Sequence, residues 1–120
     1  MQIDEKTMKE LVDAGIDMEE ASERFMGNMD MVVKFLKKFP ADPNYGLLEE
    51  ALKNREAKKA LSASHILKGV CGNLSMNVMH NLFSEQVEHI RANNWEAVLN
   101  VMGDIRTEYE KVNAALAKLP

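Results

Sequence analysis

Helix-capping residues recur at short intervals along this chain, and they constrain the fold more than any other feature of the sequence. Asp17, Asn28 and the pair Asp42-Pro43 each precede a segment with helical apolar periodicity, where a short polar side chain or an N1 proline favours the first turn. Glu20 follows Asp17 at the spacing of a capping box. Segments that alternate polar and β-branched residues are almost absent, so the sequence predicts helices throughout.

The caps and breakers divide the chain into helices joined by short connections. We expect helices over residues 4–14, 18–26, 29–39, 44–54, 55–74, 77–92 and 95–119. A chain of 120 residues has the size of one domain and can bury a core without disulfides or a metal. Because the connections are only a few residues long, neighbouring helices should pack antiparallel into a bundle.

Composition limits the classes of partner and the compartment. Hydrophobic residues make up 46% and charged residues 28%, which is the balance of a soluble globular domain. The net charge of −4 disfavours nucleic acid and anionic membrane surfaces as partners. The single cysteine excludes an internal disulfide and fits a reducing compartment. No apolar run has the length of a signal peptide or a membrane span, so we expect a cytoplasmic protein.

Two glycines, Gly69 and Gly72, stand inside the helix predicted over residues 55–74, where each is unfavourable by about 1 kcal/mol relative to alanine. At about 100° per residue, both lie within about 40° of His65. The apolar stripe of this helix lies on the opposite side and consists of Ala63, Leu67, Val70 and Leu74. His65 should therefore face solvent, beside backbone that a large partner could approach closely.

An exposed imidazole in this setting is suited to phosphoryl chemistry. Near neutral pH a free imidazole is mostly uncharged, and its lone pair is a competent nucleophile towards phosphorus. Lys68 lies one turn from His65 and can donate hydrogen bonds to a phosphoryl group carried there. Lys58 and Leu61 fall in the same sector of the helix. No carboxylate cluster accompanies His65, so the metal ion that such a transfer uses should come from a partner.

At these residues the chain resembles the histidine-containing phosphotransfer (HPt) domains of two-component phosphorelays. The family signature is His-x-Leu-Lys-Gly followed by a second small residue, which here corresponds to His65, Leu67, Lys68, Gly69 and Gly72. The segments GIDMEEASERFMGN, FLKKFPADPNYGLLEEAL and NNWEAVLNVM are also similar to small stand-alone bacterial members. The resemblance therefore spans nearly the whole chain.

The resemblance implies an all-α fold for one domain of residues 1–120. This fold is an antiparallel four-helix bundle with its core over about 17–119, and a short extra N-terminal helix over about 4–14 packs over one end. It also implies that His65 accepts a phosphoryl group from the aspartate of a response-regulator receiver domain and passes it to another receiver aspartate, in a pathway fed by a histidine kinase. Apart from the resemblance, we expect a monomer, because the exposed faces of the helices are mostly charged.

The resemblance further implies roles for the residues around His65. Lys68 would stabilise the phosphohistidine, and Gly69 and Gly72 would give the receiver access. Because Leu61 and Lys58 lie in the same sector of the helix, we expect them to belong to the receiver-docking surface as well. The receiver would bring Mg²⁺, while the chain itself would hold no cofactor. No kinase activity is expected of the chain, because it contains no glycine-rich phosphate loop and no kinase signature.

Two positions depart from the family pattern. Ser75 stands where many members have a glycine at a helix end, and a serine there could cap the next helix instead. Gln86 stands where many members have a leucine. Gln86 is either a defect in the core or a hydrogen-bond partner that faces the histidine helix, and in the second case it is a further candidate for stabilising the phosphoryl group.

Other readings of the same residues lead to different classes of function. The main alternative is a helical adaptor that docks on a receiver or a kinase through the same glycine-flanked face without being phosphorylated. A hydrolase has little support, because no second catalytic group can be matched to His65. A metal site is disfavoured, since Cys71 lies about 120° from His65 and is expected to be a buried thiol. His80 and His89 are interpreted as ordinary polar positions.

Overall fold

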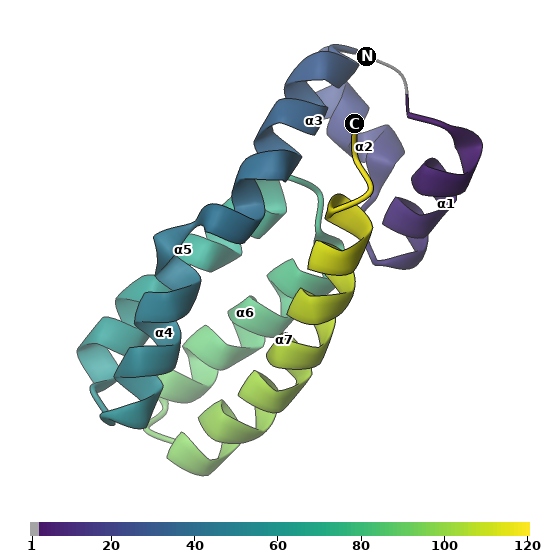
Figure 1. The fold of residues 1–120 in the computed structure, drawn as a ribbon. Coiled ribbons are helices and arrows are strands. Elements are labelled where there is room, and N and C mark those ends of the chain that lie inside the picture. Colours follow the sequence, from purple (N-terminus) through teal and green to yellow (C-terminus); the bar gives the residue numbers. More distant parts are fainter. Residues whose placement is uncertain (1–2) are drawn as a thin grey trace.

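The computed structural model describes residues 3–120, and every regular element in this range is helical (Figure 1). The elements are α1 (Glu5–Asp13), α2 (Met18–Arg24), α3 (Met29–Lys38), the short 3-10 helix η1 (Phe39–Ala41), α4 (Pro43–Lys53), α5 (Ala57–Asn73), α6 (Asn77–Arg91) and α7 (Trp95–Leu116). The all-α prediction is confirmed, and the helices begin and end within a few residues of the expected positions.

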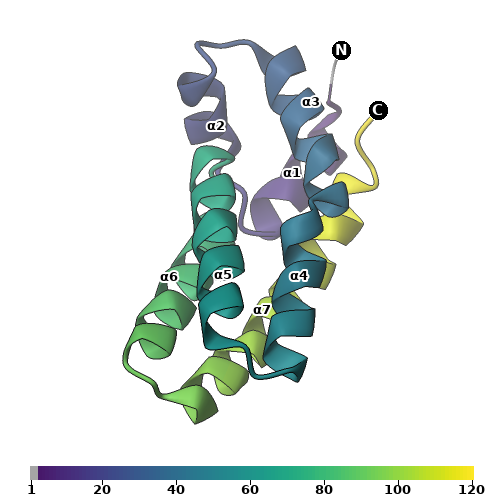
Figure 2. The same cartoon turned by 90° about the vertical axis from the view of Figure 1, so that its left-hand side faces the viewer.

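The helices form an elongated molecule of 44 × 24 × 20 Å. Figures 1 and 2 show α3 and α4 following one another along one side, linked by η1. Helix α5 packs between α4 and α6, and α7 packs against the other side of α6. Helix α1 contacts α7 and α2 at one end of the molecule. As a result, α5 is held by neighbours on two sides and keeps an outer face.

The predicted caps account for where α2, α3 and α4 begin. The side chains of Asp17, Asn28 and Asp42 each accept a backbone N–H two or three residues ahead, at 2.8–3.2 Å. The capping-box prediction for Glu20 is wrong, because its carboxylate lies 3.4 Å from Arg24 Nε instead of bonding back to Asp17. The caps were predictable because they are local, since each needs only a polar side chain and the turn that follows it.

The inner face of α5 is the apolar stripe that holds this helix against its neighbours. Ala60, Ala63, Leu67 and Cys71 are at most 4% exposed, and they join a continuous core with residues of α4, α6 and α7. Burial raises the pKa of the Cys71 thiol, so this side chain remains neutral. The prediction of a buried thiol is confirmed, and a face of α5 opposite to this stripe is left for solvent.

One isolated β-bridge, between Ile16 and Met76, joins two turns that are far apart in the sequence. The backbone N–H of Asp17 donates to the Ser75 carbonyl at 2.9 Å, and the N–H of Asn77 donates to the Gly15 carbonyl at 3.2 Å. The turn between α1 and α2 is therefore bonded to the turn between α5 and α6. This contact fixes the N-terminal helices against the end of the helix that carries His65.

Five helices end in the same way, with a residue of positive φ directly after the C-cap residue. These residues are Gly15, Met26, Arg55, Ser75 and Asn93. In each case the following N–H bonds to a carbonyl five residues earlier, as Met76 N–H does to Cys71 O at 2.9 Å, which is the Schellman motif. Ser75 has φ 55°, and its hydroxyl is buried with no hydrogen-bond partner. The expectation that Ser75 caps the next helix is therefore wrong, because it ends α5 at a position that favours glycine.

Replacing Ser75 by glycine should make the protein more stable. The change relieves a left-handed backbone conformation, which is unfavourable by about 1–2 kcal/mol for a residue with a Cβ, and it removes a buried unpaired hydroxyl. After allowing for the greater freedom of glycine in the unfolded chain, we expect the free energy of unfolding to rise by about 1 kcal/mol. Urea denaturation measures it. Asn93→Gly is the matched control and should give a smaller gain in the free energy of unfolding, because asparagine tolerates this conformation. A Ser75→Gly protein that is no more stable than the wild type would contradict the explanation.

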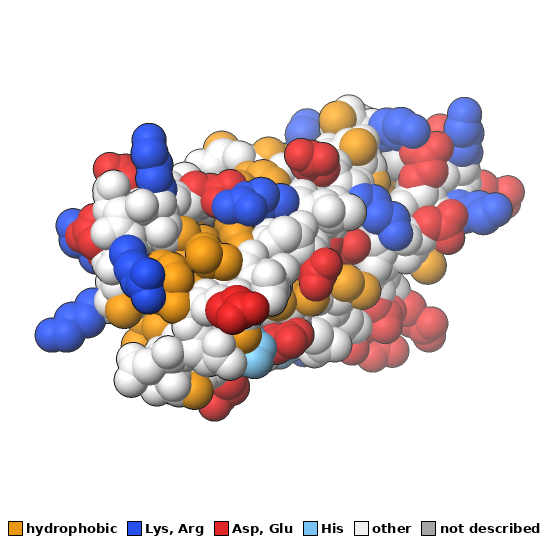
Figure 3. Space-filling model, turned by 90° about the horizontal axis from the view of Figure 1, so that it is seen from below, with side chains coloured by type: hydrophobic (Ala, Val, Ile, Leu, Met, Phe, Trp, Pro, Cys, Tyr) orange, Lys and Arg blue, Asp and Glu red, His pale blue; other side chains and the backbone are white. Residues whose placement is uncertain are grey.

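The surface carries charges of both signs. On the face shown in Figure 3, Lys and Arg side chains are interspersed with Asp and Glu, and hydrophobic side chains gather towards one end. Across residues 3–120, none of the helices combines the length and the apolarity needed to cross a membrane.

Candidate functional site

His65 lies on the outer face of α5, and its side chain is exposed as the helical spacing predicts. Lys58 and Gly69, two turns before and one turn after it, are also exposed, whereas Leu61 and Lys68 are half-buried. Leu61 packs partly against the core. The structure therefore brings the predicted residues Lys58, Leu61, His65, Lys68 and Gly69 together along one side of a single helix.

The three histidines of the chain differ in what their rings contact. The Nδ1 atom of His80 lies 2.9 Å from the backbone carbonyl of Lys68, and Nε2 of His89 lies 3.4 Å from Glu85 Oε1. His65 has no hydrogen-bond partner among the described residues. It is thus the one histidine with both an exposed side chain and two ring nitrogens open to an incoming group.

Gly69 leaves open space one turn from His65. A Cβ atom built on Gly69 would have no heavy atom within 4 Å beyond its own helix and chain neighbours. No packing requirement within the described protein therefore explains a glycine at this position. The backbone there is bare towards solvent, which fits the prediction that Gly69 gives a partner access to the imidazole.

Gly72 has a packing role that the helical spacing does not show, and its predicted role in giving a partner access stays a prediction. A Cβ on Gly72 would lie 3.0 Å from Nδ1 and 3.3 Å from Cε1 of His80 on α6. The glycine therefore makes room for the His80 ring. Since the Lys68 carbonyl can only accept, Nδ1 of His80 donates to it and bridges the two helices. The interpretation of His80 as an ordinary polar position is corrected accordingly.

Lys68 supplies a cation next to the His65 imidazole. It lies three residues further along α5, a spacing that places two side chains on the same side of a helix. Its ammonium group forms no ion pair with another described residue. An anion attached to His65 would therefore find a cation that is not already neutralised.

Gln86 does not belong to the site, and its candidate role in stabilising a phosphoryl group is wrong. The side chain is 0% exposed. Its Oε1 accepts a hydrogen bond of 2.8 Å from the Ser64 hydroxyl, and its Nε2 lies 3.4 Å from both the Val98 carbonyl and Met102 Sδ. The other alternative is confirmed, because Gln86 is a hydrogen-bond partner that faces α5. Its buried amide links α5, α6 and α7 in a place where an unpaired polar group would be unfavourable.

No metal centre is built from the described part of the chain. Residues 3–120 contain no group of three or more His, Cys, Asp or Glu side chains placed to hold an ion.

No family model matches the chain, and comparisons with curated proteins and with solved structures also find no match. The functional interpretation therefore depends on the geometry of α5 and on the chemistry of His65, Lys68 and Gly69.

Proposed function

We propose that this protein is a phosphorelay carrier of the HPt type. His65 accepts a phosphoryl group from the aspartate of one receiver domain and passes it to the aspartate of another. The observation that carries the proposal is the exposed and unbonded ring of His65 beside the open backbone of Gly69. Because the ring makes no hydrogen bond within the described protein, both of its nitrogens are open to an incoming group.

The proposal includes the bundle architecture. The rod α3–η1–α4 together with α5, α6 and α7 forms the four-helix bundle, and α1 and α2 pack at one end. Side-chain interactions between α4 and α7 support this arrangement. Arg106 binds both carboxylate oxygens of Glu49 at 2.8–3.2 Å, and the rings of Tyr45 and Tyr109 stack with centroids 3.6 Å apart. This closure of the bundle leaves the outer face of α5 at the surface.

The transfer step follows from the groups on α5. A ring nitrogen of His65 attacks the phosphorus of an aspartyl phosphate, so a nitrogen–phosphorus bond forms while the bond to the aspartate oxygen breaks and the carboxylate departs. The other ring nitrogen keeps its proton. Lys68 donates to the phosphoryl oxygens, whose charge is close to −2. Receiver and magnesium ion come from outside the chain, and the carrier works as a cytoplasmic monomer.

The direct test is transfer from a labelled receiver. The protein is incubated with magnesium and a phosphorylated receiver domain, and the product is examined for an acid-labile, alkali-stable phosphoramidate. The proposal expects such a label on the wild-type chain. If receivers bind the protein and leave no label, the adaptor function is the correct one and the carrier function is not.

Removing the cation next to His65 should weaken the phosphorylated state. We expect Lys68→Ala to slow transfer or to shorten the lifetime of the phosphohistidine by about ten- to a hundredfold, because a hydrogen bond to a charged group contributes about 1.5–3 kcal/mol. Circular dichroism should remain that of the wild type. Lys111→Ala, on α7, is the matched control and should leave both quantities unchanged. Equal lifetimes and rates in the Lys68→Ala and wild-type proteins would remove Lys68 from the proposed site.

A further inference from the structure

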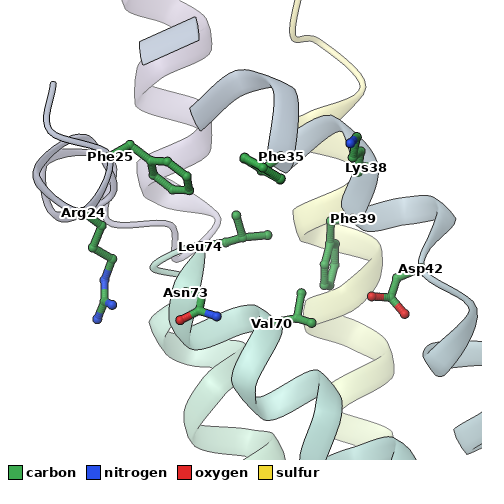
Figure 4. A pocket seen from close by; sticks show the side chains of 9 residues that line it. All are labelled: Arg24, Phe25, Phe35, Lys38, Phe39, Asp42, Val70, Asn73 and Leu74. Atoms are coloured by element: carbon green, nitrogen blue, oxygen red, sulfur yellow. The ribbon is translucent and has the colours of Figure 1, made fainter. Parts of the chain in front are cut away.

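A cavity of about 550 Å³ lies between α2, α3, η1 and the C-terminal end of α5. Figure 4 shows the side chains of Phe25, Phe35, Phe39, Val70 and Leu74 turned towards this common space. The volume falls within the range of about 300–1,000 Å³ that is typical of small-molecule sites. None of the residues assigned to phosphoryl transfer lines the cavity, so it is a separate feature of the molecule.

The walls of the cavity are apolar and only partly covered. The rings of Phe25 and Phe35 stack with centroids 5.6 Å apart, and both side chains are half-buried. Phe39 and Leu74 are almost completely buried and form the floor. Phenylalanine rings that remain partly open to water leave apolar surface that a ligand of the same character can cover favourably.

The charged groups at the rim indicate the sign of the ligand. Lys38 and Arg24 stand at the rim on different helices, in a protein of net charge −4. The Lys38 ammonium lies over the Phe35 ring, 5.3 Å from its centroid, and forms no ion pair with another described residue. Arg24 is paired only with the exposed Glu20 at 3.4 Å.

The one acidic residue at the rim is already engaged. Asp42 Oδ1 accepts from the backbone N–H and from the side-chain amide of Asn44, both at 2.8 Å, and so caps α4. Its carboxylate is therefore held by the backbone that it caps. With Lys38 and Arg24 positive and Asp42 negative, the net charge of the lining is positive.

We propose that this cavity binds a small amphipathic organic anion, consisting of an aromatic or branched apolar body and a carboxylate head group. The body lies among the three phenylalanine rings, Val70 and Leu74. The head group pairs with the Lys38 ammonium at the rim, where Arg24 adds to the positive field. This site goes beyond the proposed phosphorelay function and is independent of it, because none of its residues takes part in the chemistry at His65.

The test uses three probes that share one body and differ in charge: 4-phenylbutyrate, 4-phenylbutylamine and 4-phenylbutan-1-ol. Each is titrated into isotope-labelled protein, and backbone amide shifts are followed. We expect the carboxylate to bind most tightly, with a dissociation constant in the millimolar range or below, and to shift the amides of Phe35, Val70, Asn73 and Leu74. The proposal is overturned if the amine binds as tightly as the carboxylate, or if the shifts map elsewhere.

Two variants sharpen the result. Lys38→Gln should weaken binding of the carboxylate about three- to fivefold, as expected for one ion pair near the surface, and should leave the alcohol unaffected. Lys34→Gln is the matched control, since it removes an exposed lysine from the same helix that does not line the cavity. Val70→Trp should fill the space and abolish binding of all three probes. Equal effects of the two lysine variants would show that the carboxylate responds only to overall charge, and the proposed site would then be wrong.

Discussion

A protein in which glutamine replaces His65 should accept no phosphoryl group from a labelled receiver, and it should unfold at the same urea concentration as the wild type. The ring is exposed and has no hydrogen-bond partner among the described residues, so its removal takes away nothing that the fold uses. An amide has no lone pair able to attack phosphorus in place of imidazole nitrogen, so the loss of transfer should be complete. Labelling measures the acceptance of the phosphoryl group, urea denaturation measures stability, and circular dichroism verifies that the helices remain.

The other two histidines provide controls for this result. His89→Gln should be labelled at the wild-type level, because His89 contacts only Glu85 on its own helix. His80→Gln should also accept the label, although the loss of the bond to the Lys68 carbonyl should make it less stable. Persisting label on the His65→Gln protein would exclude His65 as the acceptor. A large loss of helicity in that variant would mean that His65 is structural.

Leucine at the two glycines of α5 should have opposite effects on stability. Gly72→Leu should lower the free energy of unfolding by about 2 kcal/mol, since its Cβ alone would lie 3.0 Å from the His80 ring and the ring must move. Gly69→Leu should raise that free energy by up to about 1 kcal/mol, because its Cβ meets nothing and leucine favours a helix. Urea denaturation of both variants measures the difference.

The two leucine variants also distinguish an effect on receiver access from an effect on folding stability. Gly69→Leu should fold well and yet receive the phosphoryl group more slowly, because its side chain stands beside His65 where a receiver must approach. The double variant Gly72→Leu/His80→Ala should recover much of the stability lost in Gly72→Leu, since the clash is removed with the ring. If Gly69→Leu transfers at the wild-type rate, access does not explain that glycine. If Gly69→Leu and Gly72→Leu are equally stable, contact with the His80 ring does not explain the glycine at position 72.

Features that depend on nearby residues could be predicted from the sequence. The caps at Asp17, Asn28 and Asp42 are local signals, and they placed the starts of three helices. The exposure of His65 and the burial of Cys71 follow from the period of a single helix, because each has a fixed direction relative to the apolar stripe.

Features that depend on a neighbouring helix could not be predicted in this way. The helical spacing places Gly72 beside His65, but it contains no information about which side chain of α6 lies there, and that side chain is His80. The partner of Gln86 on α5, Ser64, was missed for the same reason, since a polar pair 22 residues apart has no sequence signal. The role of Ser75 was predicted wrongly because a serine between two helices can either follow the end of the first or cap the start of the second. Only the φ angle shows that Ser75 ends α5.

The bridge between Ile16 and Met76 affects the first turn of α6. No side chain at the start of α6 accepts a hydrogen bond from the backbone N–H groups of that turn. Met76 is the N-cap of α6, and its side chain makes no capping hydrogen bond. The backbone N–H of Asn77 has no acceptor within α6, and it donates instead to the carbonyl of Gly15 in the turn between α1 and α2. The turn between α1 and α2 thus supplies the N-terminal cap of α6, a helix that it does not adjoin in the chain, and a change in that turn would leave this N–H of α6 without its acceptor.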